Sequence, residues 1–86
     1  MEYTQEVKSA LIEEGKDIHL RMLRATELPE VEELLALSTV NVAKLTEFSE
    51  SGSDAWTEFD SYMLMLILQA DKQLREAWET EKHSIN

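Results

Sequence analysis

The longest apolar run in the sequence is Tyr62-Met63-Leu64-Met65-Leu66-Ile67-Leu68. It is rich in Met and Leu, contains one β-branched residue, and continues into Gln69-Ala70-Asp71-Lys72 without Gly or Pro. These features favour an α-helix over a β-strand. Because successive residues of a helix point about 100° apart, seven apolar residues in a row leave no polar side. We therefore expect a helix that the rest of the chain covers from several directions.

The residues around this run extend it into an amphipathic helix. Its main apolar stripe, at helical spacing, comprises Trp56, Phe59, Met63, Leu66, Ile67, Ala70, Leu74, Ala77 and Trp78. Leu64, Met65 and Leu68 form a second apolar patch beside that stripe, and this patch needs a partner of its own. We expect no membrane span, because a span requires about 20 apolar residues and charged Asp60 and Asp71 bracket the run.

Breaks in the helical pattern are few, since the 86 residues contain two Gly and one Pro. Pro29 fits the first position of a helix, and Gly52 can end a helix in a left-handed conformation. The sequence predicts helices at about 4–24, 29–49 and 54–82 within a single domain, 1–86. The third would be the longest, so Leu74 and Trp78 should lie on an overhanging end. The predicted fold is all-α: an up-down-up three-helix bundle with a long, centrally buried C-terminal helix.

Two local features leave alternatives open. Gly15 can break the first helix, and the alternation of Ile18, Leu20 and Met22 with polar residues is compatible with a short strand after it. A lone strand has nothing here to pair with, so a continuous helix is the preferred interpretation. Ser38 lies in the middle of the apolar stripe of the second helix, where a small residue indicates close approach of another helix.

The turn Ser51-Gly52-Ser53-Asp54 follows an acidic helix in a small acidic chain, and in this it resembles the DNase-binding colicin immunity proteins. In that family the next feature is a tyrosine pair followed by proline. Here Ala55-Trp56-Thr57-Glu58 stands instead. Because of this departure we assign no family and transfer no site residue.

The net charge of −10 is concentrated in the middle of the chain. Residues 26–60 contain nine acidic residues and one basic residue, and so carry −8 of that charge. Such a field repels nucleic acid and anionic membranes and attracts basic proteins. The N-terminus lacks a secretory pattern and the chain lacks Cys, which favours a cytoplasmic protein.

No pattern typical of a metal, cofactor or catalytic site is apparent. Di-metal helical bundles use Glu-x-x-His pairs, but Lys16 stands three residues before His19, and Thr80 three before His83. Two glycines cannot form a glycine-rich phosphate loop. The sequence around each of the two histidines contains no glycine-rich turn that could act as a nucleophile elbow. We therefore expect no enzyme activity, no metal and no cofactor.

The most plausible function is a small protein–protein interaction module, an inhibitor or adaptor that presents an acidic helix face to a basic partner. The residues predicted to form this face are Glu30, Glu32, Glu33, Glu47, Glu50 and Asp54. The simpler interpretation is that these acids only keep a small domain soluble. The alternative function is a structural subunit that assembles with copies of itself, and a homodimer is compatible with both functions. Self-association through the third helix would use Leu64, Met65, Leu68, Leu74 and Trp78.

Overall fold

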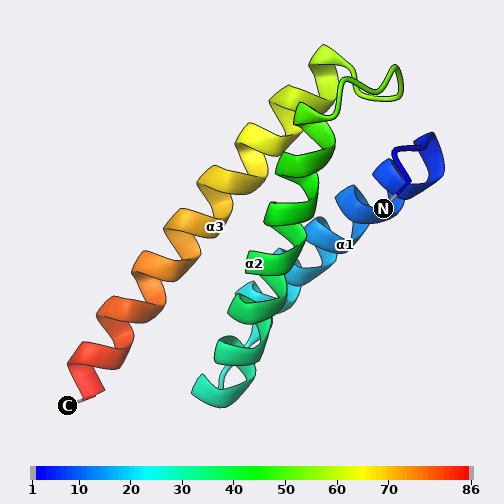
Figure 1. Ribbon diagram of the computed structural model, residues 1–86. Coiled ribbons are helices and arrows are strands. Elements are labelled where there is room, and N and C mark those ends of the chain that lie inside the picture. Colours follow the sequence, from blue (N-terminus) through cyan, green and yellow to red (C-terminus); the bar gives the residue numbers. More distant parts are fainter. Residues whose placement is uncertain (1, 86) are drawn as a thin grey trace.

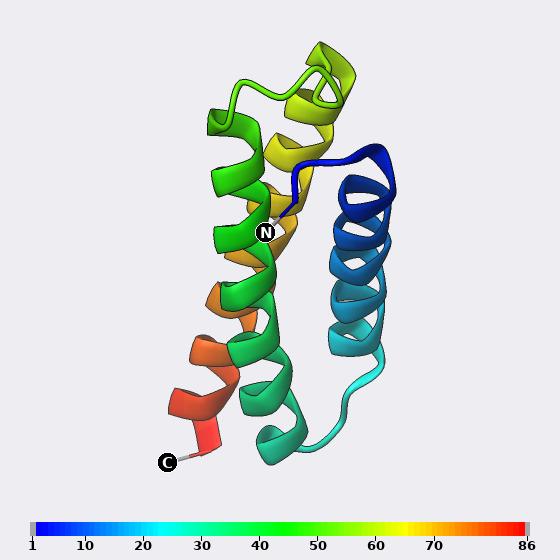
Figure 2. The same ribbon diagram turned by 45° about the vertical axis from the view of Figure 1, so that its right-hand side comes forward.

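A computed structural model describes the backbone of residues 2–85 and the side chains of residues 2–80. The chain forms three α-helices, α1 (Gln5–Arg24), α2 (Leu28–Glu50) and α3 (Glu58–Ile85). Each helix packs against the other two, and residues 2–85 contain no strand. Figures 1 and 2 show α2 returning alongside α1, and α3 descending beside both from the turn that follows α2. The prediction of an all-α protein of three packed helices is confirmed.

The first two helices begin and end close to the predicted residues. At the start of α1, Thr4 Oγ1 accepts a hydrogen bond from the Val7 N–H at 3.2 Å, and Pro29 lies in the first turn of α2. Gly52 follows α2 with a φ of 76°, a left-handed conformation that favours glycine. Because α1 continues through Gly15, the alternative with a strand after this residue is wrong.

The start of α3 differs from the prediction, since the helix begins at Glu58 and not near residue 54. The Thr57 N–H donates to Asp60 Oδ2 at 2.9 Å, and the Asp60 N–H donates to Thr57 Oγ1 at 3.3 Å. This reciprocal pair is a capping box, which fixes the first turn of a helix. Residues 53–57 therefore belong to the connection between α2 and α3.

The core consists of two apolar clusters, one toward each end of the bundle. The first contains Leu11, Leu45, Phe48, Leu64 and Ile67, and the second contains Ile18, Met22 and Leu34. In the first cluster the Phe48 ring also contacts the rings of Tyr3 and Trp56, with centroids 5.2 and 5.6 Å apart. The segment before α1 thereby packs onto the end of α2, as Figure 2 shows.

Burial does not single out α3 as the central helix. Of its described apolar side chains only Leu64 and Ile67 are buried, whereas α2 buries the four apolar residues Val31, Leu34, Leu45 and Phe48. The apolar run of α3 exceeds what two neighbouring helices can cover. Its excess faces outward, with Phe59, Tyr62, Met65, Leu66 and Leu68 between 40% and 68% exposed.

Three residues predicted for self-association are placed differently from the prediction. Leu64 is buried in the first cluster and does not belong to an exposed patch. Leu74 packs against the second cluster, and Trp78 is half-buried in a cleft with Leu28 and Leu35. The predicted overhang is wrong because the first turns of α2 lie beside the later turns of α3. Met65 and Leu68 are exposed, as predicted.

Candidate functional site

All six acidic residues of the predicted binding face are exposed: Glu30, Glu32, Glu33, Glu47, Glu50 and Asp54. Glu47 accepts a hydrogen bond from the Tyr3 hydroxyl at 2.7 Å. This bond to an anionic acceptor raises the pKa of Tyr3. The other five carboxylates make no hydrogen bond or ion pair with any residue that the structure describes. Their charges are therefore available at the surface.

The six acids of the predicted face form two groups along the chain. Glu30 and Glu47 are separated along α2 by about 25 Å, from 1.5 Å per residue. Between the groups lie Leu37 and Val40, 41% and 51% exposed, and exposed Lys44. Alternating steps of four and three residues lead from Glu33 through Leu37, Val40 and Lys44 to Glu47. This spacing places all five residues on one side of the helix. We call the six acids together with Leu37, Val40 and Lys44 the acidic surface.

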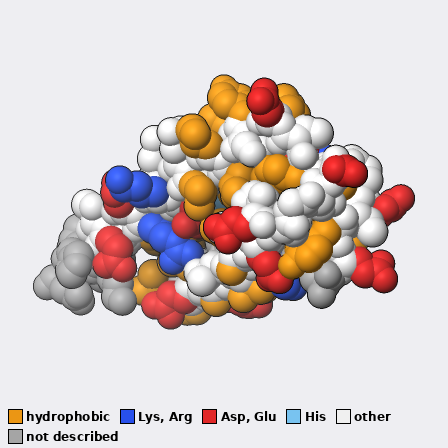
Figure 3. Space-filling model, turned by 45° about the horizontal axis from the view of Figure 1, so that its top comes forward, with side chains coloured by type: hydrophobic (Ala, Val, Ile, Leu, Met, Phe, Trp, Pro, Cys, Tyr) orange, Lys and Arg blue, Asp and Glu red, His pale blue; other side chains and the backbone are white. Residues whose placement is uncertain are grey.

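Two of the four acids on α1 are paired with basic residues, unlike the acids of the acidic surface. Glu13 pairs with Lys16 at 3.3 Å, and Asp17 pairs with Arg21 at 4.0 Å. Such exposed pairs contribute little to stability, but they balance the local charge. Figure 3 shows a face of the molecule on which acidic side chains are widely spread, with hydrophobic side chains gathered in patches between them. The four acids of α1 are matched by four basic residues, whereas α2 contains five acids and one basic residue.

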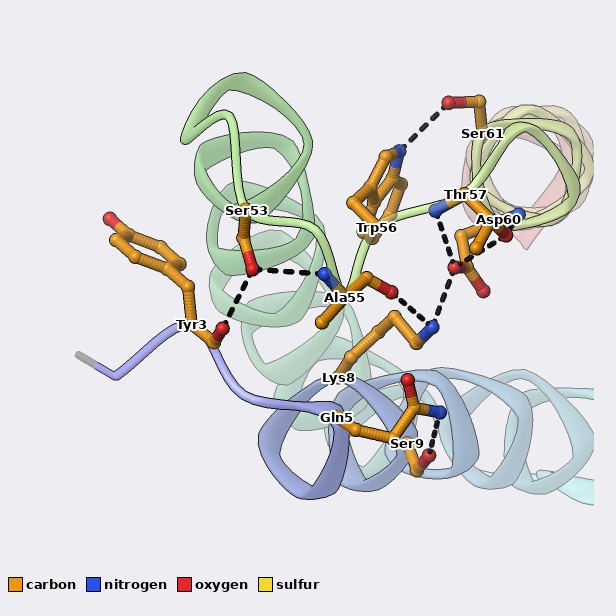
Figure 4. A network of polar contacts seen from close by, with 10 residues as sticks. All are labelled: Tyr3, Gln5, Lys8, Ser9, Ser53, Ala55, Trp56, Thr57, Asp60 and Ser61. Carbon is orange, nitrogen blue, oxygen red and sulfur yellow. Dashed lines mark hydrogen bonds and ion pairs between the residues drawn. The ribbon is translucent and has the colours of Figure 1, made fainter.

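A buried ion pair joins α1 to the start of α3 (Figure 4). The Lys8 ammonium, in a residue only 5% exposed, donates to Asp60 Oδ2 at 2.7 Å and to the Ala55 carbonyl at 2.5 Å. Burial alone would raise the pKa of Asp60, but hydrogen bonds from Lys8 and Thr57 and the charge of Lys8 outweigh it and lower the pKa. This pair holds the α2–α3 connection against α1.

A second, partly buried polar cluster joins all three helices. The Ser38 hydroxyl donates to Asp71 Oδ1 at 2.5 Å, and His19 Nε2 lies 3.4 Å from both Ser38 Oγ and Asp71 Oδ1. Arg75 Nε donates to Asp71 Oδ2 at 2.7 Å, and its guanidinium also reaches the Leu35 carbonyl at 3.0 Å. Burial alone would raise the pKa of Asp71, but these bonds and the Arg75 charge lower it.

The residue types Ser, His and Asp also occur in hydrolytic triads, but this cluster has a different geometry. In a triad the serine hydroxyl faces the substrate and donates to the histidine. Here Ser38 is 1% exposed and donates to Asp71. The cluster therefore positions helices. The small residue predicted at a helix contact is indeed buried, and its hydroxyl reaches α3.

Sequence reasoning missed both Lys8 and Asp60 as interior residues. Lys8 occupies an inward position of α1, since it lies one turn before Leu11 and two turns before Gly15, both of which are buried. An apolar pattern cannot identify a lysine as interior. The spacing Thr57-x-x-Asp60 directly before the apolar run was a visible signal, because it is typical of a capping box.

The described residues contain neither a metal-binding cluster of His, Asp and Glu nor a membrane-spanning helix. Among them no three His, Asp or Glu residues are grouped so that they could hold a metal ion. No helix in the described part of the chain is long and apolar enough to cross a membrane. The side chain of His83 lies outside the described residues.

Comparison with protein-family models, with curated proteins and with solved structures yields no match for this chain.

Proposed function

We propose that this protein is a protein–protein interaction module, an inhibitor or adaptor, whose acidic surface on α2 binds a basic partner protein. The observation that carries the proposal is the group of five exposed, unpaired carboxylates of Glu30, Glu32, Glu33, Glu50 and Asp54. They flank the exposed apolar residues Leu37 and Val40. A charged rim around an apolar centre is the common arrangement of protein interfaces.

The electrostatics of the chain supports the choice of a basic partner. Like charges on one side of a helix repel one another, so an unbalanced group of acids does not stabilise the fold. The same charges raise the rate at which a basic protein meets the surface, and they oppose acidic partners and nucleic acid. The partner that fits presents Lys or Arg at two places about 25 Å apart, from the rise of 1.5 Å per residue along α2, with apolar side chains between them.

The proposal is tested by affinity capture from an extract of the organism that makes the protein, followed by measurement of the affinity for the captured partner at several salt concentrations. We expect a partner with a basic binding surface and an affinity that falls steeply as ionic strength rises. An affinity that is independent of salt, or a partner whose contact surface is acidic, would contradict the proposal.

A second candidate function is a structural subunit that assembles with copies of itself through α3. The observation that favours it is the set of large apolar side chains that α3 exposes, because exposed apolar patches on small proteins mark interaction sites. A chain that assembles in this way but captures no basic partner would favour this second function over the first.

A further inference from the structure

An apolar groove of about 320 Å³ runs between α1 and α3, and its lining residues all come from these two helices and not from α2. Its walls include Leu20 and Leu23 from α1, and Met63, Leu66 and Ala70 from α3. Leu20 and Leu23 are 51% and 68% exposed, and Leu66 is 40% exposed. We call these five residues the α1–α3 groove. An apolar surface of this kind is usually covered by another molecule.

The apolar face of α3 continues beyond the groove toward the start of the helix. Phe59 lies one turn before Met63, and Tyr62 lies one turn before Leu66, so both belong to the same side of the helix. Phe59 is 68% exposed and Tyr62 is 57% exposed. The groove and these two rings form one strip, with a hollow at one end and projecting aromatic side chains at the other.

The strip carries almost no net charge, although the chain as a whole carries −10. Between residues 59 and 70 the sequence has one charged residue, Asp60, and that residue is buried and paired with Lys8. On the α1 side Lys16 lines the groove and pairs with Glu13 at 3.3 Å. Two copies of this acidic chain can therefore meet along the strip without placing like charges opposite one another, which they could not do along α2.

We propose that the α1–α3 groove is covered by a second copy of this chain in a two-fold symmetric pair, with Phe59 of each copy over Ala70 of the other. Phe59 and Ala70 lie on the same side of α3, eleven residues apart. When two α3 helices pair antiparallel and the two-fold axis passes midway between residues 59 and 70, the Phe59 ring of each copy meets Ala70 of the other. The contact is then identical in both directions, as a two-fold interface requires.

The size of the strip places the pair among the small, weak interfaces. Leu20, Leu23, Phe59, Tyr62 and Leu66 are 40–68% exposed, so covering them removes on the order of 500 Å² per copy and roughly 1,000 Å² in total. That total is at the lower limit of specific interfaces, so the pair should form at micromolar concentration. Because net charge opposes association, the pair should become tighter as salt is raised. The inference concerns the surface of the second candidate function and does not depend on a basic partner.

The test is sedimentation equilibrium across the micromolar range for the full chain and for two matched variants. Leu66 and Leu68 are 40% and 43% exposed, but they point to opposite sides of α3, so Leu66→Gln changes the strip and Leu68→Gln does not. We expect a dimer that Leu66→Gln weakens by about ten-fold or more, because each dimer carries the change twice. Leu68→Gln should change the dimerisation constant by less than about two-fold.

Leu20→Gln, on the other wall of the groove, should weaken the dimer as Leu66→Gln does, and circular dichroism checks that each variant folds. A chain that stays monomeric at high salt would overturn the inference, as would a dimer that Leu68→Gln weakens more than Leu66→Gln. A monomer that uses Leu66 to bind a different protein would also overturn it. Replacing Glu30, Glu33 and Glu47 by Gln should leave the dimer intact or tighten it. Binding of a basic partner and formation of the dimer therefore respond to different variants, and failure of one proposal can be told from failure of the other.

Discussion

The carboxylates that join the helices of this protein and those of its acidic surface lie in opposite environments. Asp60 is buried and held by Lys8 and Thr57, and Asp71 accepts bonds from Ser38 and Arg75. By contrast, the exposed acids at the start of α2 have no such partner among the described residues. Charged groups that hold the fold together are paired inside the bundle. The unpaired charges lie where a second molecule can reach them, and this contrast is the basis of the proposed function.

The largest effect should come from breaking the buried pair. In Lys8→Met the Asp60 carboxylate loses its ammonium partner inside the protein, and removing one member of a buried pair typically costs about 3–5 kcal/mol. Urea denaturation should show a loss of this size. The double variant Lys8→Met, Asp60→Asn should regain part of it, because no buried charge is left unpaired and the side-chain amide oxygen at position 60 can still accept from the Thr57 N–H. A single variant that loses less than about 1 kcal/mol would show that the pair does not hold the fold.

A smaller loss is expected where Gly15 of α1 packs against Asn41 of α2. Asn41 is 1% exposed and donates to the Leu11 carbonyl at 2.9 Å, while its Oδ1 has no hydrogen-bond partner in the described part of the chain. A Cβ at Gly15 would lie 2.7 Å from this Oδ1. Gly15→Ala should therefore destabilise the protein by about 1–3 kcal/mol in urea denaturation, as overpacking does.

The matched control for this prediction is Gly15→Ala in an Asn41→Ala background, in which the added methyl group meets no amide oxygen. There the gain in helix propensity, about 1 kcal/mol, should be recovered. Stabilisation by Gly15→Ala alone would contradict the close packing of the two helices at this point.

Acid should destabilise the protein through the hydrogen-bonded carboxylates of Asp60 and Asp71. The folded pKa values of Asp60 and Asp71 lie below the ordinary 3.8. Their contribution to stability is complete above the ordinary value and is lost as pH falls through the lower folded values. The melting temperature should therefore drop below about pH 4, and it should drop less steeply in Asp60→Asn. Equal acid dependence in the two proteins would contradict a stabilising role for the Asp60 carboxylate.

The helices were predictable from the sequence, but the orientation of α3 was not. Periodicity located three helical segments, and Pro29 and Gly52 marked the breaks between them. Periodicity placed Leu66 in the main apolar stripe and Leu64 beside it, but the structure has the reverse: Leu64 faces the core and Leu66 faces outward. Residues 62–68 are apolar on every side, so the pattern alone does not fix which side is inward. Only the contacts with the other two helices decide which of these side chains is covered.

The candidate site was predictable to a similar extent. The exposure of acids such as Glu33 and Glu47 followed from their position opposite the apolar stripe of α2. The division of the acids into two groups could also be predicted, because it follows from their spacing along the helix. Their lack of hydrogen-bond and ion-pair partners could not, because it depends on which side chains the fold places beside them. Lys8 was unpredictable for a related reason, since its burial depends on Asp60, which is distant in sequence.

The smallest effect on stability is expected at the acidic surface. Replacing Glu30, Glu33 and Glu47 by Gln should change the free energy of unfolding by no more than about 0.5 kcal/mol per site. The change should be neutral or favourable, because like charges are removed. Thermal denaturation at low salt measures it, and a clear loss of stability would mean that these acids serve the fold. Loss of the Tyr3–Glu47 hydrogen bond is the one structural cost.

The most direct test of the proposed function is the affinity of the captured partner for two variants of equal charge. One carries Gln at Glu30, Glu33 and Glu47, and the control carries Gln at the exposed residues Glu6, Glu14 and Glu76, which lie on α1 and α3. Both variants lose three negative charges, so any difference between them reports position and not net charge. We predict that the first loses affinity by at least about ten-fold while the control binds nearly as well as the unmodified protein. Equal affinity of the two variants would contradict the proposal that the acidic surface binds the partner.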